Sequence, residues 1–188
     1  FADKKIWKVN LETKLSDLEK AIEENAKVIS PKNGESTKDA LKAVAENTKI
    51  IPQLKKCEIA NMPSIQWLIG LAYSDGYGVK KDHKKAVQYF QKAAELGNIN
   101  ALNNLGFCYS NGQGVKKDYG QAVEYYQKAE KFGNTIAVHN LGVCYYNGWG
   151  VEKDYNKAVE YYQKAEKLGN TDAINNLGIC YKNGNGVE

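Results

Sequence analysis

Two consecutive stretches decide the fold of this chain: NALNNLGFCYSNGQGVKKDYGQAVEYYQKAEKFGNT (residues 100–135) and IAVHNLGVCYYNGWGVEKDYNKAVEYYQKAEKLGNT (residues 136–171). They agree at 26 of 36 positions, which makes them two copies of one repeat. The glycines that mark the repeat continue outward at the same spacing, at Gly70, Gly106, Gly142 and Gly178. We therefore place further copies at 64–99 and 172–188, the last of which stops before its second half.

Each copy predicts two helices joined by a glycine loop. In the copy at 100–135, Asn98 or Asn100 caps the first helix and Asn111-Gly112 ends it, since glycine tolerates the left-handed conformation there. Asp118 caps the second helix, which Gly133 ends. The stripes to be buried comprise Ala101, Leu105 and Tyr109 on the first helix and Ala122, Tyr126 and Ala129 on the second. Two such helices cannot bury their stripes alone, so the copies must stack.

The exposed side of the second helix and the loop valine carry two smaller predictions. Glu124 and Lys128 lie four residues apart and predict an ion pair on the outside of the helix. The valine after each Gly-x-Gly loop, Val115 in this copy, is expected to fill the gap between the two helices.

Composition limits the partners of the chain. Its 188 residues carry a net charge of +4, and every basic residue is lysine because the sequence contains no arginine. Arginine is the usual reader of phosphates and guanine edges, so a nucleic-acid partner is not expected. No apolar run is long enough to span a membrane.

The first third of the chain is less regular. We assign residues 1–63 to a helical N-terminal cap, because repeat arrays need atypical ends that cover the last apolar face. Residues 36–63 could belong to a diverged copy, since Cys57 falls in phase with Ala93, Ala129 and Ala165. At the other end, either the natural chain continues past Glu188 or another surface, such as a second copy in self-association, covers the truncated last copy.

The repeat resembles the Sel-one-like repeat (SLR) family, which is related to the tetratricopeptide repeats. The matching residues in one copy are Ala101, Leu105-Gly106, Tyr109, Gly112, Gly114-Val115, Asp118, Ala122, Lys128-Ala129 and Gly133. The resemblance covers residues 64–188 and implies an all-α fold, a right-handed α-solenoid superhelix of antiparallel helix pairs. It also implies that the protein is an adaptor or scaffold, although a fold alone does not define a function.

The cysteines are expected to be packing residues. Cys108, Cys144 and Cys180 share one repeat position where the first copy has Ala72, and Cys57 also stands at an alanine position. Equivalent positions in stacked helices lie about 8–10 Å apart, beyond the reach of about 7 Å that a disulfide allows between Cα atoms. The sequence has no CxxC motif, so we expect no zinc site.

Catalytic motifs are not evident, and we expect neither an enzyme nor a cofactor. The Gly-x-Gly loops follow helices rather than strands and recur in every copy, which favours tight turns over a phosphate site. His83 and His139 have no acid or nucleophile in their local motifs. The tyrosine pairs at repeat spacing, such as Tyr125-Tyr126, are expected to pack between helices rather than to stack on bases.

Positions that differ between copies are candidates for partner recognition. On the first helix they fall at i, i+3, i+7 and i+10, on the side opposite the buried stripe. By resemblance to tetratricopeptide arrays this side lines a concave groove, and the loop tip adds a tryptophan. The predicted partner-binding residues are Trp67, Leu71, Asn103, Phe107, Ser110, His139, Val143, Tyr146, Trp149, Asn175 and Ile179. Aromatic residues among amides suit a peptide or a protein partner.

Three functions remain open from the sequence. The first is a non-enzymatic scaffold or adaptor that binds a protein or peptide in the groove. The second is an inhibitor or immunity-type protein that blocks one enzyme or toxin, and the third is a hydrolase related to the cell wall. Unpaired cysteines favour a reducing, cytoplasmic compartment, while a secreted or periplasmic location stays open.

Overall fold

The computed structural model describes residues 62–76 and 79–187. The chain divides into two compact units, Phe1–Ala43 and Val44–Glu188, and every described residue belongs to the second. The predicted cap over residues 1–63, with its diverged copy and Cys57, lies outside the described residues except for Met62 and Pro63.

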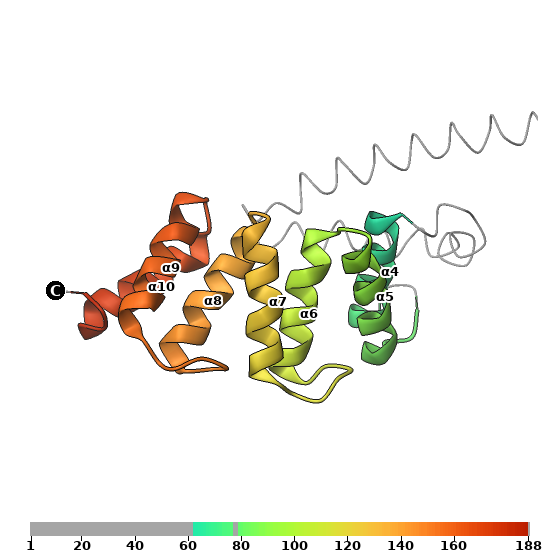
Figure 1. Ribbon diagram of the computed structural model, residues 1–188, viewed down its shortest axis with the longest axis horizontal. Helices are drawn as coiled ribbons and strands as arrows, with labels where there is room; N and C mark the ends of the chain where they lie inside the picture. The colour runs from blue at the N-terminus through green and yellow to red at the C-terminus, as the bar shows by residue number, and fades with distance from the viewer. Residues whose placement is uncertain (1–61, 77–78, 188) are drawn as a thin grey trace, which may run out of the picture. The chain divides into compact units, whose positions relative to one another are not determined.

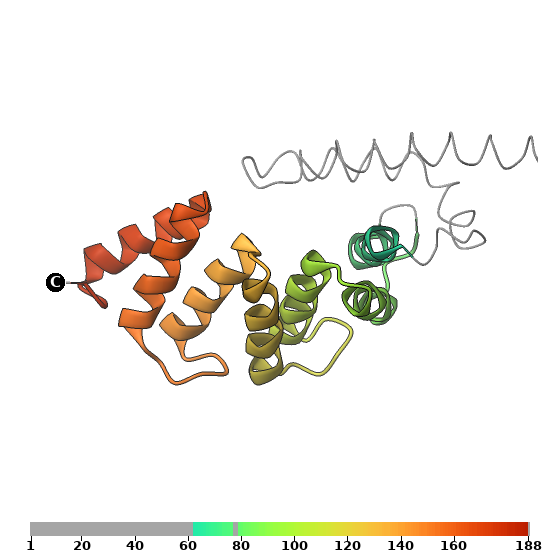
Figure 2. The same cartoon turned by 45° about the horizontal axis from the view of Figure 1, so that its top comes forward.

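The described residues form seven helices and no strands. The first helices of the copies are α4 (Pro63–Asp75), α6 (Ile99–Asn111), α8 (Thr135–Asn147) and α10 (Thr171–Asn183). The second helices are α5 (His83–Glu95), α7 (Tyr119–Lys131) and α9 (Tyr155–Lys167). Each helix packs against the next one in the chain, and Figures 1 and 2 show them following one another in this order. The predicted all-α solenoid of tandem helix pairs is confirmed.

Side-chain caps start the helices where the sequence predicts them. The Asn98 carboxamide oxygen accepts from the backbone N–H of Ala101 at 2.9 Å, and the Asp118 carboxylate accepts from that of Gln121 at 3.0 Å. Gly112 ends α6 with a φ of 70°. The long loops after α6 and α8 lie along the lower edge of Figure 1, and the short connections after α7 and α9 lie along its upper edge.

The core extends within each copy and from each copy to the next. One cluster joins Tyr126 and Ala129 of α7 to Leu141 and Cys144 of α8. The loop residue Val151 packs against this cluster, which lies between two copies, whereas the sequence predicted that it fills the gap between the two helices of its own copy. Because each second helix shares its core with the next first helix, no copy is complete without its neighbour.

The two glycines of each Gly-x-Gly loop have different structural roles. The first ends the helix, whereas the second lies against the preceding copy. A Cβ added at Gly114, Gly150 or Gly186 would overlap the backbone of His83, Tyr119 or Tyr155, respectively. All three glycines have positive φ, between 70° and 75°. The second glycine is therefore a contact between copies as well as a turn.

The predicted ion pair on the outside of the second helix is wrong. Glu124 and Lys128 are not among the ion pairs of the described residues, and the Lys128 amine instead lies 5.2 Å from the centre of the Tyr125 ring. An exposed ion pair gains little in water, so the broad face of the aromatic ring competes well for the ammonium.

Candidate functional site

Four apolar residues form a row across the first helices of the solenoid. The apolar row comprises Leu71, Phe107, Val143 and Ile179, one from each copy. Phe107 is 48% exposed and Ile179 is 47% exposed, while Leu71 and Val143 are half-buried. We call the surface around this row the first-helix face. All four members of the row belong to the predicted groove.

A ladder of hydrogen bonds joins the first helices directly. The Trp67 indole N–H donates to the Asn104 carboxamide oxygen at 3.0 Å, which links α4 to α6. The Asn140 amide donates to the Asn103 carboxamide oxygen at 3.1 Å, which links α6 to α8. The ladder lies one helical turn before the apolar row, so the two run side by side across the same helices.

His139 forms the third step of the ladder. Its Nε2 lies 2.8 Å from the Asn176 amide nitrogen on α10, and its ring centre lies 5.9 Å from that of Tyr162. Burial lowers the pKa of His139, partly opposed by the negative charge of Asp172 and by a hydrogen bond with Asn140. The neutral imidazole can accept the amide hydrogen through Nε2, which makes this residue a structural link between copies.

Trp67, one of the predicted partner-binding residues, is buried, with only 8% of its surface exposed. The hydrogen bond to Asn104 of the next copy satisfies the only donor of the indole ring. Trp67 supports the stacking of α4 on α6 and offers little surface to a partner.

Ser110 and Tyr146 lie at the C-terminal ends of α6 and α8, at the edge of the first-helix face. The Ser110 hydroxyl donates to the Phe107 carbonyl at 3.0 Å. The Tyr146 hydroxyl accepts from the Asn185 amide at 2.9 Å, and its ring contacts Tyr155 edge-on with centres 5.0 Å apart. Tyr146 is thus held in place by the loop of the following copy.

Trp149 is a loop residue, as predicted, but it is not free. Its indole stacks on Tyr119 of the preceding copy with ring centres 5.2 Å apart, and 40% of its surface remains exposed. The Lys117 amine lies 4.6 Å from the centre of the same tyrosine ring. Asn175 on α10, in contrast, is exposed and makes no side-chain hydrogen bond among the described residues.

Two tyrosines stack on each other inside each complete copy, a pairing that was not predicted from the sequence. Ring centres of Tyr109 and Tyr125 lie 5.5 Å apart, and those of Tyr145 and Tyr161 lie 5.4 Å apart. Tyr73 and Tyr89 form the same stack at 5.6 Å, and the paired positions are separated by 16 residues in all three copies, a repeated spacing that was the available signal. These rings pack the two helices of a copy, as the packing interpretation of the tyrosine pairs requires.

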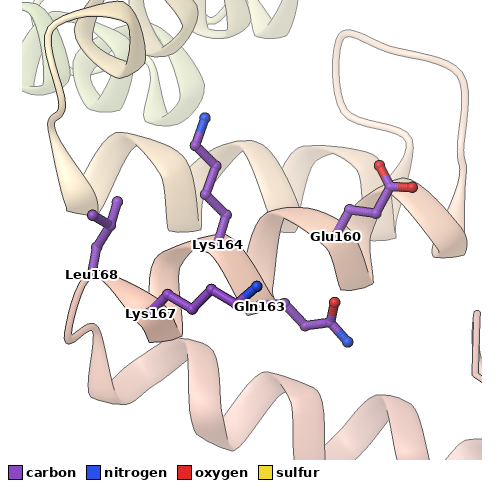
Figure 3. A pocket seen from close by; sticks show the side chains of 5 residues that line it. All are labelled: Glu160, Gln163, Lys164, Lys167 and Leu168. Carbon is purple, nitrogen blue, oxygen red and sulfur yellow. The ribbon is translucent and has the colours of Figure 1, made fainter.

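A shallow pocket of about 330 Å³ lies on α9, away from the first-helix face (Figure 3). It is lined by Glu160, Gln163, Lys164, Lys167 and Leu168. Every lining residue comes from one helix or its C-terminal cap, and the Lys164 amine is paired with the Glu130 carboxylate at 2.7 Å. The pocket therefore does not bring together groups from different copies, unlike the first-helix face.

The three described cysteines are buried free thiols. Burial raises the pKa of Cys108 and of Cys144 to about 11, and it raises the pKa of Cys180 in the same direction. Within the described residues, no group of His, Cys, Asp and Glu is arranged to hold a metal ion, and no helix is long and apolar enough to cross a membrane.

Alkylation of Cys108 and Cys144 is expected to be slow in the native protein. Because the thiolate is the reactive form, raising the pKa from 9.0 to about 11 lowers its population at pH 8 by about 100-fold. Site-resolved mass spectrometry after an iodoacetamide pulse measures the rates. The same pulse in denaturing urea is the control, and equal rates in both conditions would contradict the burial of these thiols.

These features define a helical repeat protein whose copies are joined by paired side chains and whose first helices present a shared face. The model of the Sel1 repeat matches residues 64–98, 99–131, 135–170 and 171–188. The chain belongs to the Sel1 repeat family. Sel1 repeats are generally protein-interaction modules and are typically non-catalytic.

Solved structures of other Sel1 repeat proteins resemble this one. A Sel1 repeat protein from Oxalobacter formigenes is 33% identical with a TM-score of 0.73, over 80% of this chain and 61% of its own. The protective antigen c5321 of uropathogenic Escherichia coli is 30% identical with a TM-score of 0.65, over 95% and 37%. Cysteine rich protein B of Helicobacter pylori is 34% identical with a TM-score of 0.53, over 70% and 96%. The search of curated proteins found no match.

Proposed function

We propose that this protein is a non-enzymatic scaffold that binds a protein or peptide partner through the first-helix face. One observation carries the proposal: the apolar row is apolar in every copy although its side chains are exposed or half-buried. Packing of the solenoid does not require Phe107 and Ile179 to be apolar, since about half of each side chain faces solvent. Exposed apolar side chains flanked by polar groups are typical of interaction sites.

The proposed site is narrower than the sequence prediction. Trp67, His139 and Tyr146 make contacts between copies, so their replacement would disturb stacking as well as any binding. Phe107 has the largest exposed fraction in the apolar row, and its side chain contributes no hydrogen bond. It is therefore the position at which binding and stability are most easily separated. An inhibitor would bind its target through the same face. It would differ from a scaffold only in that its partner is an enzyme or toxin whose activity it blocks.

Phe107→Ala is expected to abolish most partner capture while leaving the fold intact. Truncating a central aromatic anchor costs about 2 kcal/mol or more of binding free energy. Immobilised wild-type protein and variants are incubated with lysate of the source cells, and captured proteins are quantified by mass spectrometry. Circular dichroism verifies that the variant keeps its helical content.

Phe132→Ala is the matched control. Phe132 is 67% exposed and caps the C-terminal end of α7, outside the apolar row. Proteins that bind the proposed site are retained by Phe132→Ala and lost with Phe107→Ala. Capture that is equal for both variants would assign binding to another surface.

A further inference from the structure

We infer that the first copy, residues 64–99, holds a second binding site: a pocket that takes an acidic, carboxylate-bearing segment of a protein partner. This first-copy pocket has a volume of about 470 Å³, which suits a few residues of a peptide. Its walls include Tyr73 of α4 and Lys85, Gln88, Tyr89, Lys92 and Glu95 of α5. None of these residues belongs to the apolar row, so the inference goes beyond the proposed function.

A pocket of about 300 Å³ at the same repeat positions of the third copy, residues 136–171, provides an internal comparison. In both copies the two tyrosine rings stack, with centres 5.6 Å and 5.4 Å apart. In both copies, a lysine amine also lies 5.3–5.4 Å from the centre of the first tyrosine ring. The lining residues Tyr145, Lys157, Tyr161 and Lys164 stand in the places of Tyr73, Lys85, Tyr89 and Lys92. The framework is the same, so the two pockets differ mainly in their charge.

Glutamates balance the lysines of the third-copy pocket. The Lys164 amine is paired with the Glu130 carboxylate of the preceding copy at 2.7 Å, and Glu160 adds a second negative charge to the lining. With Lys157, the lining carries as many negative as positive side chains. A carboxylate ligand would be repelled by the two glutamates, so this pocket is a poor acceptor for it.

Two residues leave the first-copy pocket positive. Gln88 stands where the other complete copies have Glu124 and Glu160. Lys92 occupies the position of Lys164, but it forms no ion pair among the described residues. The pocket therefore presents an ammonium group whose counter-charge can come from a ligand.

The other charges at the pocket do not cancel this ammonium. Lys85 is paired with Asp82 at 3.6 Å, but 55% of its side chain is exposed, and such a pair contributes little and rearranges easily. Glu95 is the only acid of this lining, so its two lysines leave an excess of one positive charge. Charge complementarity thus favours a ligand that brings a negative group to this pocket.

The walls favour a carboxylate with an apolar neighbour over a phosphate. The Lys92 ammonium and the Gln88 amide can both donate to carboxylate oxygens, and the half-buried Tyr89 ring offers an apolar wall beside them. A phosphate carries nearly two negative charges and is best bound by arginine, which this chain lacks. An acidic residue next to an aromatic one in a partner segment matches these groups.

Three fluorescein-labelled peptides of equal length test the ligand class by fluorescence anisotropy. The first has two glutamates flanking a phenylalanine, the second has glutamines in place of the glutamates, and the third has phosphoserines there. The first is expected to bind about tenfold more tightly than the second, because only the carboxylate forms charge-assisted hydrogen bonds. The third should bind no more tightly than the first. Raising sodium chloride from about 50 mM to about 500 mM should remove most of the difference between the first two, since salt screens exposed charges.

Gln88→Glu is the decisive variant. It gives the first-copy pocket the residue that the other complete copies have at this position, so the fold is expected to accept it. The added negative charge should weaken binding of the glutamate peptide about fivefold, and Lys92→Gln should do the same. Lys128→Gln removes the same charge from the same repeat position of the second copy and should leave binding unchanged. Circular dichroism verifies the helical content of each variant.

The opposite results would overturn the inference. If the glutamate and glutamine peptides bind equally, the pocket does not recognise a carboxylate. If Lys128→Gln weakens binding as much as Lys92→Gln, binding follows net charge and the pocket is not the site. Tighter binding of the phosphoserine peptide would overturn the assignment to a carboxylate.

Phe107→Ala separates this site from the proposed function. It should leave binding of the glutamate peptide unchanged while abolishing most partner capture. A loss of peptide binding would place the peptide on the first-helix face and overturn the first-copy pocket, while the proposed function stands. If capture does not depend on Phe107 but peptide binding depends on Lys92, the proposed function fails and the pocket stands.

Discussion

Replacing Gly150 with alanine is expected to lower the free energy of unfolding by about 3–4 kcal/mol. Two costs add. The residue has a φ of 72°, where an L-residue with a Cβ is strained by about 1 kcal/mol. The new Cβ would also overlap the Tyr119 carbonyl group and come within 2.8 Å of the Gly120 nitrogen. These are backbone atoms of the preceding copy, so relief requires the two copies to separate.

Gly169→Ala measures the backbone strain at positive φ alone, without the overlap between copies. Gly169 has a φ of 87°, but nothing lies within 4 Å of a Cβ built there, and it is exposed like Gly150. We expect this control to lose only about 1 kcal/mol. Urea denaturation followed by circular dichroism measures both variants. Gly150→Ala should also split the transition in two, because the damaged contact couples neighbouring copies. Equal losses in the two variants would show that the contact between copies contributes no stability.

Gly142→Ala is expected to lower the free energy of unfolding by about 1–3 kcal/mol, although alanine is the better helix former. Gly142 lies inside α8, and a Cβ there would come within 2.6 Å of Tyr162 Cδ1 and Cε1. The tyrosine ring is 2% exposed and cannot move aside. The helices α8 and α9 would have to part, at a cost greater than the gain in helix propensity.

Gly178→Ala should raise the free energy of unfolding, whereas Gly142→Ala should lower it. This glycine occupies the same repeat position on α10, but nothing in the described residues lies within 4 Å of an added Cβ. The substitution should stabilise the protein by about 0.5–1 kcal/mol, the usual difference between glycine and alanine inside a helix. The pair is measured by the same urea titration. A stabilised Gly142→Ala variant would contradict the close approach of α8 to the Tyr162 ring.

The open side of α10 explains this difference in sign. Tyr181 is 57% exposed and Ile174 is 50% exposed, whereas the residues at the corresponding positions in earlier copies are packed against neighbouring helices. Self-association through this helix stays a prediction. The partner-binding residues as a set stay predictions as well, because they define where binding is proposed.

Local rules explain why the helices could be predicted. The caps Asn98 and Asp118 bind backbone groups three residues away, and Gly112 needs only its own positive φ. Such interactions act within one turn, so a single copy carries all the information for its helices. The members of the apolar row could also be predicted, because the outer side of a helix follows from its buried stripe.

Contacts between copies could not be predicted by comparing the copies. The comparison assumes that a position that differs is free of the repeat. Trp67, Asn103 and His139 differ, yet each is paired with an asparagine at one shared repeat position of the following copy. An asparagine side chain both donates and accepts, so it can bond an indole N–H, a carboxamide oxygen or an imidazole nitrogen. The asparagine can therefore stay the same while the residue that it pairs with changes from copy to copy.

The 36-residue pattern determined the helices, their order and the need to stack, because those follow from interactions within a turn and from burial of apolar stripes. Only the tertiary structure decided which varying residues remain exposed. Trp67 became buried and His139 became a link between helices because partners about 37 residues away approach them within 3.0 Å and 2.8 Å. Phe107 has no such partner, so about half of its surface remains exposed to solvent in the candidate site.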